Sequence, residues 1–189
     1  HHLRVDPDSD PSKVPYLANT GSFPVQISDG KLNVGLVWGG SPTHKNDHNR
    51  SLTLSQLKPF LDITGCRFHN LQVDDRKLEI SADGLSDHVL DMTDNIRDLA
   101  DTADLIAQLD LVIAVDTSVA HLAGAMGTPV WILLPKPADW RWLRDREDSP
   151  WYPTARLFRQ TKRGDWEDVI ERVASELEAY SLRQAGRLN

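Results

Sequence analysis

The segment from residue 109 to residue 125 constrains the fold most strongly, because an apolar run there ends in a polar cluster that opens a helix of small residues. The run 111–115 is continuously apolar, as expected for a strand that is buried on both faces of a parallel sheet. A helix is predicted over 118–126, and it ends at Gly127. A strand, a polar turn and a helix in this order are typical of α/β proteins.

The polar turn in this segment predicts an anion site. Asp116, Thr117 and Ser118 are all good N-cap residues, and the first turn of a helix leaves backbone N–H groups unpaired. The helix dipole and these donors favour negative charge, and His121 lies about one turn into the helix, where its ring can reach the same anion. The segment alone leaves open the alternative of a well-capped helix with a buried histidine.

Strands and helices alternate along most of the chain. The acidic region 74–93 is predicted to be mostly loop with one short helical turn, and Pro59 predicts a kink or an early end of the helix that contains it. The pattern indicates an α/β fold, a Rossmann-like, doubly wound and mostly parallel sheet. Strands are predicted at 33–38, 66–72, 111–115, 130–134 and 156–159, and helices at 51–61, 101–108, 118–126 and 165–177.

The length of 189 residues predicts one main domain. We expect this domain over residues 33–189. Residues 1–32 are rich in Pro, Asp, Ser and Gly, which indicates a linker that packs locally or the remnant of a preceding domain. The chain begins with His1-His2 and has no signal peptide, which suggests a trimmed tag or a fragment of a longer protein.

Composition argues against several classes of protein. No apolar run approaches the roughly 20 residues that span a bilayer, so we expect no membrane span. The net charge of −7 argues against nucleic-acid partners, and an anionic ligand would need a local basic patch. A single cysteine, Cys66, excludes an intrachain disulfide and a multi-cysteine zinc site, and cytoplasmic localisation is the default expectation.

The loop after the first predicted strand supplies such a basic patch. Gly39 and Gly40 allow close backbone approach, Lys45 and Arg50 supply charge for a phosphate, and Asn46 adds an amide. The alternative is a solvated loop whose charges face water. Because the carboxyl ends of parallel strands meet at one edge of a sheet, this loop and the polar turn after residue 115 should share a rim.

Gln72 stands at the end of the next predicted strand. Its amide could pair with a nucleobase or only with the backbone. A glycine-rich edge, two cations, a helix N-terminus and a histidine on one rim suit a nucleotide diphosphate.

Other motifs carry less weight. There is no dinucleotide-binding GxGxxG, P-loop or HExxH sequence. Asp6, Asp8 and Asp10 have the spacing of metal-binding carboxylates, but solvated side chains are the favoured interpretation, and we expect no metal. Anchoring of a loop against the core is favoured over a base-stacking surface for the aromatic and basic cluster of Trp140, Arg141, Trp142, Arg144, Arg146 and Trp151.

From about residue 33 to residue 177 the chain resembles the carboxyl-terminal half of a GT-B glycosyltransferase, of the bacterial kind found after tetratricopeptide repeats and related to the heptosyltransferases. The aromatic motifs around residues 139–143 and 148–153 are rather specific to the branch with repeats. The stretches that carry the resemblance are Val34–Gly40, His44–Asp47 with Arg50–Leu52, Asp101–Ala103, Asp116–Ala125, Asp139–Leu143 and Asp148–Pro153.

The resemblance implies a site for a nucleotide-sugar donor that needs no metal and no further cofactor. It implies that Lys45 and Arg50 approach the diphosphate and that Gln72 lies near the base. In such families the acceptor and the general base belong to the amino-terminal half, so no catalytic residue is assigned and this chain alone is expected to be inactive. The resemblance also implies that Thr117, Ser118 and His121 hold the diphosphate at the helix start, and Asp116 is the remaining residue predicted for the site.

The expected function is donor binding in a hexosyl- or heptosyl-type glycosyltransferase that transfers a sugar from a nucleotide-sugar to an unknown acceptor. Two alternatives remain open. One is a non-catalytic module that binds a nucleotide or sugar-nucleotide for recognition, and the other is a scaffold whose loops bind no nucleotide.

Overall fold

The computed structural model describes residues 14–27 and 30–186. A six-stranded sheet, parallel throughout, forms its centre, with the strand order β3-β2-β1-β4-β5-β6. The predicted doubly wound α/β fold is therefore confirmed. The strands are β1 (Leu32–Val37), β2 (Cys66–Asn70), β3 (Val89–Asp91), β4 (Leu111–Val115), β5 (Val130–Leu134) and β6 (Ala155–Arg159).

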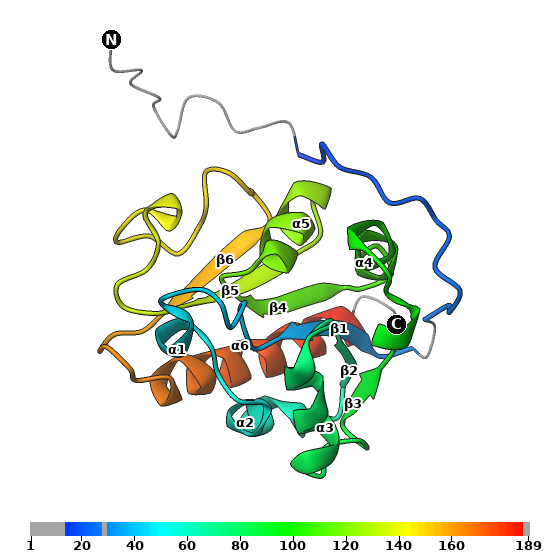
Figure 1. The fold of residues 1–189 in the computed structure, drawn as a ribbon, viewed down its shortest axis with the longest axis horizontal. Helices are drawn as coiled ribbons and strands as arrows, with labels where there is room; N and C mark the ends of the chain where they lie inside the picture. The colour runs from blue at the N-terminus through cyan, green and yellow to red at the C-terminus, as the bar shows by residue number, and fades with distance from the viewer. Residues whose placement is uncertain (1–13, 28–29, 187–189) are drawn as a thin grey trace.

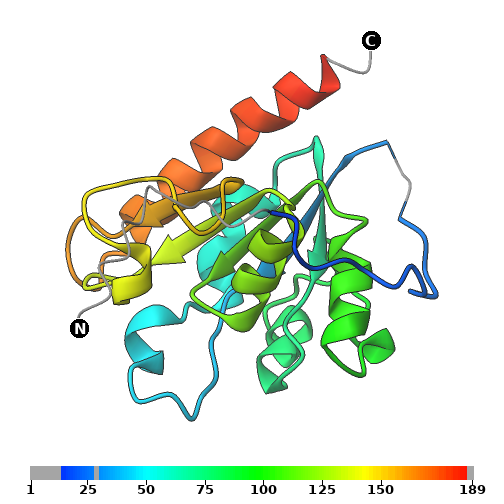
Figure 2. The ribbon, with the colours of Figure 1, turned by 90° about the horizontal axis from the view of Figure 1, so that it is seen from above.

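Helices cover both faces of this sheet (Figure 1). On one face α2, α3 and α6 pack on side chains such as Val34 and Leu36, and on the other α4 and α5 pack on side chains such as Val112 and Ala114. Figure 2 shows the long α6 lying along its face. The helices are α1 (Asp47–Arg50), α2 (Lys58–Leu61), α3 (Glu79–Ala82), α4 (Leu99–Ile106), α5 (Ser118–Met126) and α6 (Glu167–Ala185), and the 3₁₀ helices are η1 (Leu54–Leu57), η2 (Asp75–Leu78), η3 (Thr93–Asn95) and η4 (Trp140–Trp142).

The strand order reverses between β1 and β4. From β1 the chain proceeds outward through β2 to β3, and then returns to the other side of β1 to form β4 and continue outward to β6. In open parallel sheets such a switch point leaves a crevice outside the carboxyl ends of the two strands. The loops after β1 and β4 are the two that the sequence singles out for an anion.

Several predicted elements differ in detail. The acidic stretch 74–93, predicted to be mostly loop, contains η2, α3 and the edge strand β3. Pro59 causes no kink, because it stands in the first turn of a new helix, α2, where a missing N–H costs no hydrogen bond. Helix α4 begins two residues earlier than predicted, capped by Asp98, and α6 runs eight residues beyond the predicted end at residue 177.

Residues 14–27, which we call the strap, lie along α5 and α4 before the chain enters β1 (Figure 1). The backbone N–H of Tyr16 donates to the carbonyl of Ala125 at the end of α5, and Phe23 is buried in the core. Asp104 of α4 accepts hydrogen bonds at 2.5–3.0 Å from the backbone and hydroxyl groups of three consecutive strap residues, Thr20, Gly21 and Ser22. The hydrogen bonds from Thr20, above all, hold the pKa of the Asp104 carboxyl far below its usual range.

The hydrogen bonds between Asp104 and the strap should make the stability of the protein sensitive to acid. Because the pKa of Asp104 is lower in the folded than in the unfolded chain, its contribution to stability is complete above the ordinary aspartate pKa and is lost as the pH falls below it. Replacing Asp104 with asparagine should lower the Tm by a few degrees at neutral pH. Asp87→Asn, at an exposed carboxylate, is the matched control. In thermal melts from about pH 7 to about pH 3, the Tm of wild type should fall further than the Tm of Asp104→Asn. Equal falls in Tm would contradict the stabilising role of the Asp104 hydrogen bonds.

Among the described residues, no helix combines the length and apolar character that crossing a bilayer requires. Cys66 is a free and buried cysteine, and burial raises the pKa of its thiol to about 11.

Candidate functional site

A hollow of about 520 Å³ opens at the carboxyl edge of the sheet, at the switch point between β1 and β4. Its walls come from the loop after β1, the end of β2, the start of α5 and the segment that holds η4. Eight of the ten residues predicted for the site line this hollow, namely Gly39, Gly40, Arg50, Gln72, Asp116, Thr117, Ser118 and His121.

Helix α5 opens onto this hollow without a side-chain cap. Thr117 is the N-cap residue, with extended backbone, yet its hydroxyl makes no capping hydrogen bond. The Thr117 Oγ1 atom is buried and has no hydrogen-bond partner among the described residues. The first N–H groups of a helix have no intrahelical partner, so the helix start offers backbone donors and a hydroxyl to the same space.

The Arg50 guanidinium reaches this helix start from α1. Its Nη1 donates to the backbone carbonyl of Asp116 at 2.8 Å, and its Nε lies 3.7 Å from the Asp47 carboxylate. The side chain is only 14% exposed, and Nε has no hydrogen-bond partner among the residues that the structure describes. A buried cation with an unused donor is costly unless an anion completes its coordination.

Gly39 and Gly40 line the hollow and also contact polar side chains of the protein. Both N–H groups already donate within the protein, Gly39 to the side-chain oxygen of Gln72 and Gly40 to the hydroxyl of Ser51. A Cβ atom on Gly40 would lie 2.5 Å from Nη2 of Arg50, and one on Gly39 would collide with the side chain of Arg76. The two glycines therefore make room for two guanidinium groups.

Gln72 links two strand ends. Its Oε1 accepts from Gly39 at 3.0 Å, and its Nε2 donates to the carboxylate of Asp74 at 2.8 Å. The side chain is buried although it lines the hollow. The sequence left open whether the Gln72 amide pairs with a nucleobase or with backbone. In the structure it bonds to the backbone of Gly39 and to the carboxylate of Asp74, and so it stabilises the wall of the hollow.

His121 lies between two aromatic rings. It stacks on Trp142 with ring centroids 5.0 Å apart and planes inclined by 16°, and its Nδ1 is 2.9 Å from the hydroxyl of Tyr152. Its Nε2 is 3.8 Å from Oδ1 of Asp116. Burial lowers the pKa of His121, an effect that Asp116 opposes and Arg141 reinforces, so the ring is neutral at pH 7.

Sequence reasoning missed Arg141, which lines the hollow with a half-exposed side chain. It also missed the contacts of Trp142 and Tyr152 with His121. The predicted anchoring of the aromatic segment describes the fully buried Trp142, whereas Trp140 is 74% exposed. The position of the two aromatic motifs, after the strand beside β4, indicates that they lie near the site. The residue types alone do not show which of the aromatic rings faces the core.

Lys45 and Asn46 do not line the hollow. Lys45 is exposed in the loop between β1 and α1, and Asn46 accepts a hydrogen bond from Asn49 at 2.6 Å. The sequence could not separate them from Arg50, because all three stand in one polar loop and only the fold decides which side chain turns inward.

No cluster of three or more metal-ligating side chains occurs in the described part of the chain. Asp6, Asp8 and Asp10 lie outside the described residues.

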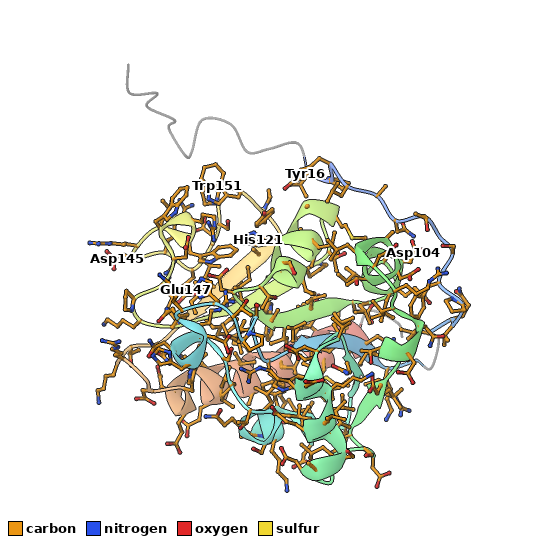
Figure 3. All side chains as sticks on the ribbon, in the orientation of Figure 1. Tyr16, Asp104, His121, Asp145, Glu147 and Trp151 are labelled. Carbon is orange, nitrogen blue, oxygen red and sulfur yellow. The ribbon has the colours of Figure 1, made fainter. Side chains whose placement is uncertain are left out.

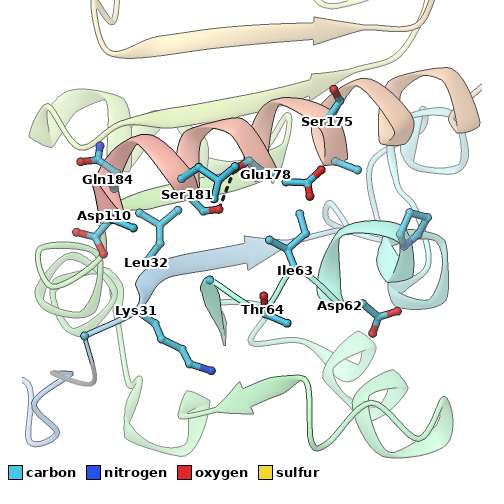
Figure 4. Close-up of a pocket in the computed structure, with 16 residues that line it drawn as sticks. Lys31, Leu32, Asp62, Ile63, Thr64, Asp110, Ser175, Glu178, Ser181 and Gln184 are labelled. Atoms are coloured by element: carbon cyan, nitrogen blue, oxygen red, sulfur yellow. Dashed lines mark hydrogen bonds between the residues drawn. The ribbon is translucent and has the colours of Figure 1, made fainter. Parts of the chain in front are cut away.

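A larger hollow, of about 690 Å³, lies at the opposite edge of the sheet beside α6 (Figure 4). Its lining includes both signs of charge, the Lys31 ammonium group and the carboxylates of Asp62, Asp110 and Glu178. It holds none of the residues predicted for the site, and strand amino ends are not where open parallel sheets bind ligands.

Comparisons with known proteins give similarities in sequence and in fold. Residues 95–136, which contain β4 and α5, match the family model of glycosyltransferase family 9 (heptosyltransferase). Protein FlbA of Caulobacter vibrioides is 33% identical over 153 residues, which are 78% of this chain and 25% of FlbA. The chain therefore spans about a quarter of that relative.

Two solved structures of E. coli share the fold. The ADP-heptose LPS heptosyltransferase II superposes with a TM-score of 0.60 at 20% identity, covering 84% of this chain and 49% of that one. The heptosyltransferase WaaC with ADP superposes with a TM-score of 0.53 at 14% identity, covering 85% of this chain and 46% of that one. The described fold thus corresponds to about half of each heptosyltransferase.

Proposed function

We propose that this chain is the donor-binding domain of a heptosyltransferase-like glycosyltransferase, and that the hollow holds the diphosphate of a nucleotide-sugar. The observation that carries the proposal is the uncapped start of α5, where the buried Thr117 hydroxyl is unpaired beside the Arg50 guanidinium. Backbone donors, a hydroxyl and a fixed cation at one helix N-terminus suit a phosphate group. The match over residues 95–136 to glycosyltransferase family 9 supports the same assignment.

The residues of the hollow divide between the parts of a donor. Thr117, Ser118 and Arg50 bind the diphosphate, and His121 donates to it from the first turns of α5. The nucleoside lies toward the end of β2, beside the wall that Gln72 braces. Lys45 and Asn46, outside the hollow, contribute long-range attraction or backbone shape rather than direct contacts.

Such a site favours sugar transfer by stabilising the nucleoside diphosphate as it leaves, with donors that need no reorganisation when the charge develops. The general base and the acceptor are unassigned. From the resemblance of its motifs we also propose a bacterial, cytoplasmic protein in which tetratricopeptide repeats precede this domain.

Calorimetric titration of the 189-residue chain with ADP, UDP, GDP and CMP, with and without Mg²⁺, tests the proposal. ADP comes first because the solved relative WaaC is described with ADP. We expect one nucleoside diphosphate to bind saturably and independently of Mg²⁺. Thr117→Val keeps the shape but removes the hydroxyl, and should weaken that binding by about fivefold to tenfold. Absence of binding at millimolar concentrations would overturn the proposal.

An assay of sugar transfer distinguishes a donor domain of a transferase from a recognition module that only binds the nucleotide. The full-length protein, supplied with the sugar conjugate of the nucleotide that binds, should release nucleoside diphosphate. Binding without any release, in the presence of a cell extract as the source of acceptors, would favour the recognition module.

A further inference from the structure

His121 is held more rigidly than phosphate binding alone requires. Its ring stacks on Trp142 and meets the edge of Tyr152 at a centroid distance of 5.7 Å. The Tyr152 ring is itself fixed against α5, because a Cβ atom on Gly124 would collide with it. Two aromatic rings and a glycine therefore define the plane of the imidazole, and one hydrogen bond, between Nδ1 and the Tyr152 hydroxyl, defines its rotation.

The position of Asp116 decides which nitrogen of the neutral ring carries the proton. Nε2 lies 3.8 Å from the carboxylate of Asp116, and both residues line the hollow. A lone pair on Nε2 would face that negative charge, whereas an N–H there is attracted to it. The field of Asp116 therefore favours a proton on Nε2 and leaves Nδ1 as an acceptor.

Tyr152 can donate to that acceptor. A phenol has one proton to donate, and the Tyr152 hydroxyl lies 2.9 Å from Nδ1 of His121. Burial, above all, raises the pKa of Tyr152 to about 12, so the hydroxyl keeps its proton throughout the neutral range. Figure 3 shows His121 on α5 and Tyr16 on the strap.

We propose that Tyr152 is a positioning residue for His121: its hydroxyl donates to Nδ1, so that the neutral imidazole presents an Nε2–H donor to the diphosphate in the hollow. This inference rests on the proposed function for its ligand, but the state of the ring exists without ligand. His121 then acts as a neutral donor and needs no added proton at pH 7.

A neutral donor has a recognisable pH dependence. The groups that face His121 are Asp116 at the helix start, Arg141 and Asp139 near η4, and Tyr152. Affinity for an ADP-sugar, whose diphosphate has no proton to lose in this range, should be flat between about pH 7 and about pH 8.5. If binding required the imidazolium, affinity would fall about tenfold for each pH unit above the histidine pKa.

Nitrogen-15 NMR of the free protein, labelled in its histidine rings, tests the tautomer directly. Wild type at about pH 7.5 should show His121 protonated on Nε2, with Nδ1 as a hydrogen-bonded acceptor. In Tyr152→Phe, which keeps the ring, the Nδ1 signal should move to that of an unbonded acceptor. A proton on Nδ1, or a charged ring, in wild type would overturn the proposal.

Titration with ADP supplies the second readout. Tyr152→Phe should weaken binding by about threefold to tenfold, because an unanchored ring no longer holds its donor in place. The matched control is Tyr180→Phe, which removes a hydroxyl from a ring on α6 that packs on Trp131, away from the hollow. Equal affinities of Tyr152→Phe and wild type would overturn the positioning role. If wild type bound none of the nucleotides titrated, the proposed function would be overturned. The tautomer seen by NMR tests the inference separately, because it is measured without ligand.

Discussion

Arg50→Ala is expected to weaken nucleoside diphosphate binding by about tenfold to one-hundredfold, the value of one charge-assisted hydrogen bond to a phosphate. The guanidinium is 14% exposed, fixed to the carbonyl of Asp116 and seated over Gly40, so it pays little entropy on binding. Lys45 does not line the hollow, and Arg76 of η2 is paired with Asp47 at 2.6 Å, so neither is placed to replace Arg50.

Three further variants make this result specific. Arg50→Lys keeps the charge but loses the planar fork, and should recover only part of the affinity. Lys45→Ala should change affinity by less than about threefold, as expected for an exposed charge. Lys58→Ala, on α2 away from the hollow, controls for net charge. Isothermal titration gives the affinities, and circular dichroism checks folding. A Lys45→Ala effect as large as that of Arg50→Ala would show that the loop rearranges around the ligand.

Trp142→Ala is expected to lower the free energy of unfolding by about 3–5 kcal/mol, as for other buried aromatic side chains cut back to alanine. Trp142 is fully buried, and its ring supports His121. Trp140→Ala, two residues away in the same η4 but 74% exposed, should stay within about 0.5 kcal/mol of wild type. Urea unfolding with linear extrapolation measures both. Similar effects of the two variants would contradict the assigned packing. Trp142→Phe, which retains a ring, should lose less stability and keep the nucleotide site measurable.

The sequence predicts the strand, turn and helix from β4 to α5 well, because its signals are local: apolar residues, then N-cap types, then small helical residues, then Gly127. It misses β3, because three residues with two exposed side chains show no periodicity. It also places the polar loop 39–50 at the correct edge of the sheet.

Long-range contacts were beyond the sequence. Gly39 and Gly40 lie against the side chains of Arg76 and Arg50, which the fold brings to them. His121 contacts Tyr152, which is 31 residues further along the chain. Residue type gives the chemistry of such groups but not which of them share a space, since that depends on the crossing of α5 over the sheet and on the path of the segment around η4.

Three glycines lie so close to a large side chain that the two positions of each pair are expected to covary in evolution. A side chain at position 40 would displace the guanidinium group seen at position 50, one at position 39 would displace that at position 76, and one at position 124 would collide with the ring at position 152. In diverging descendants of this chain, the residues of each pair should therefore vary in a correlated way. A relative that keeps the arginine at position 50 should keep the glycine at position 40, and one that loses the glycine should have lost this way of binding an anion.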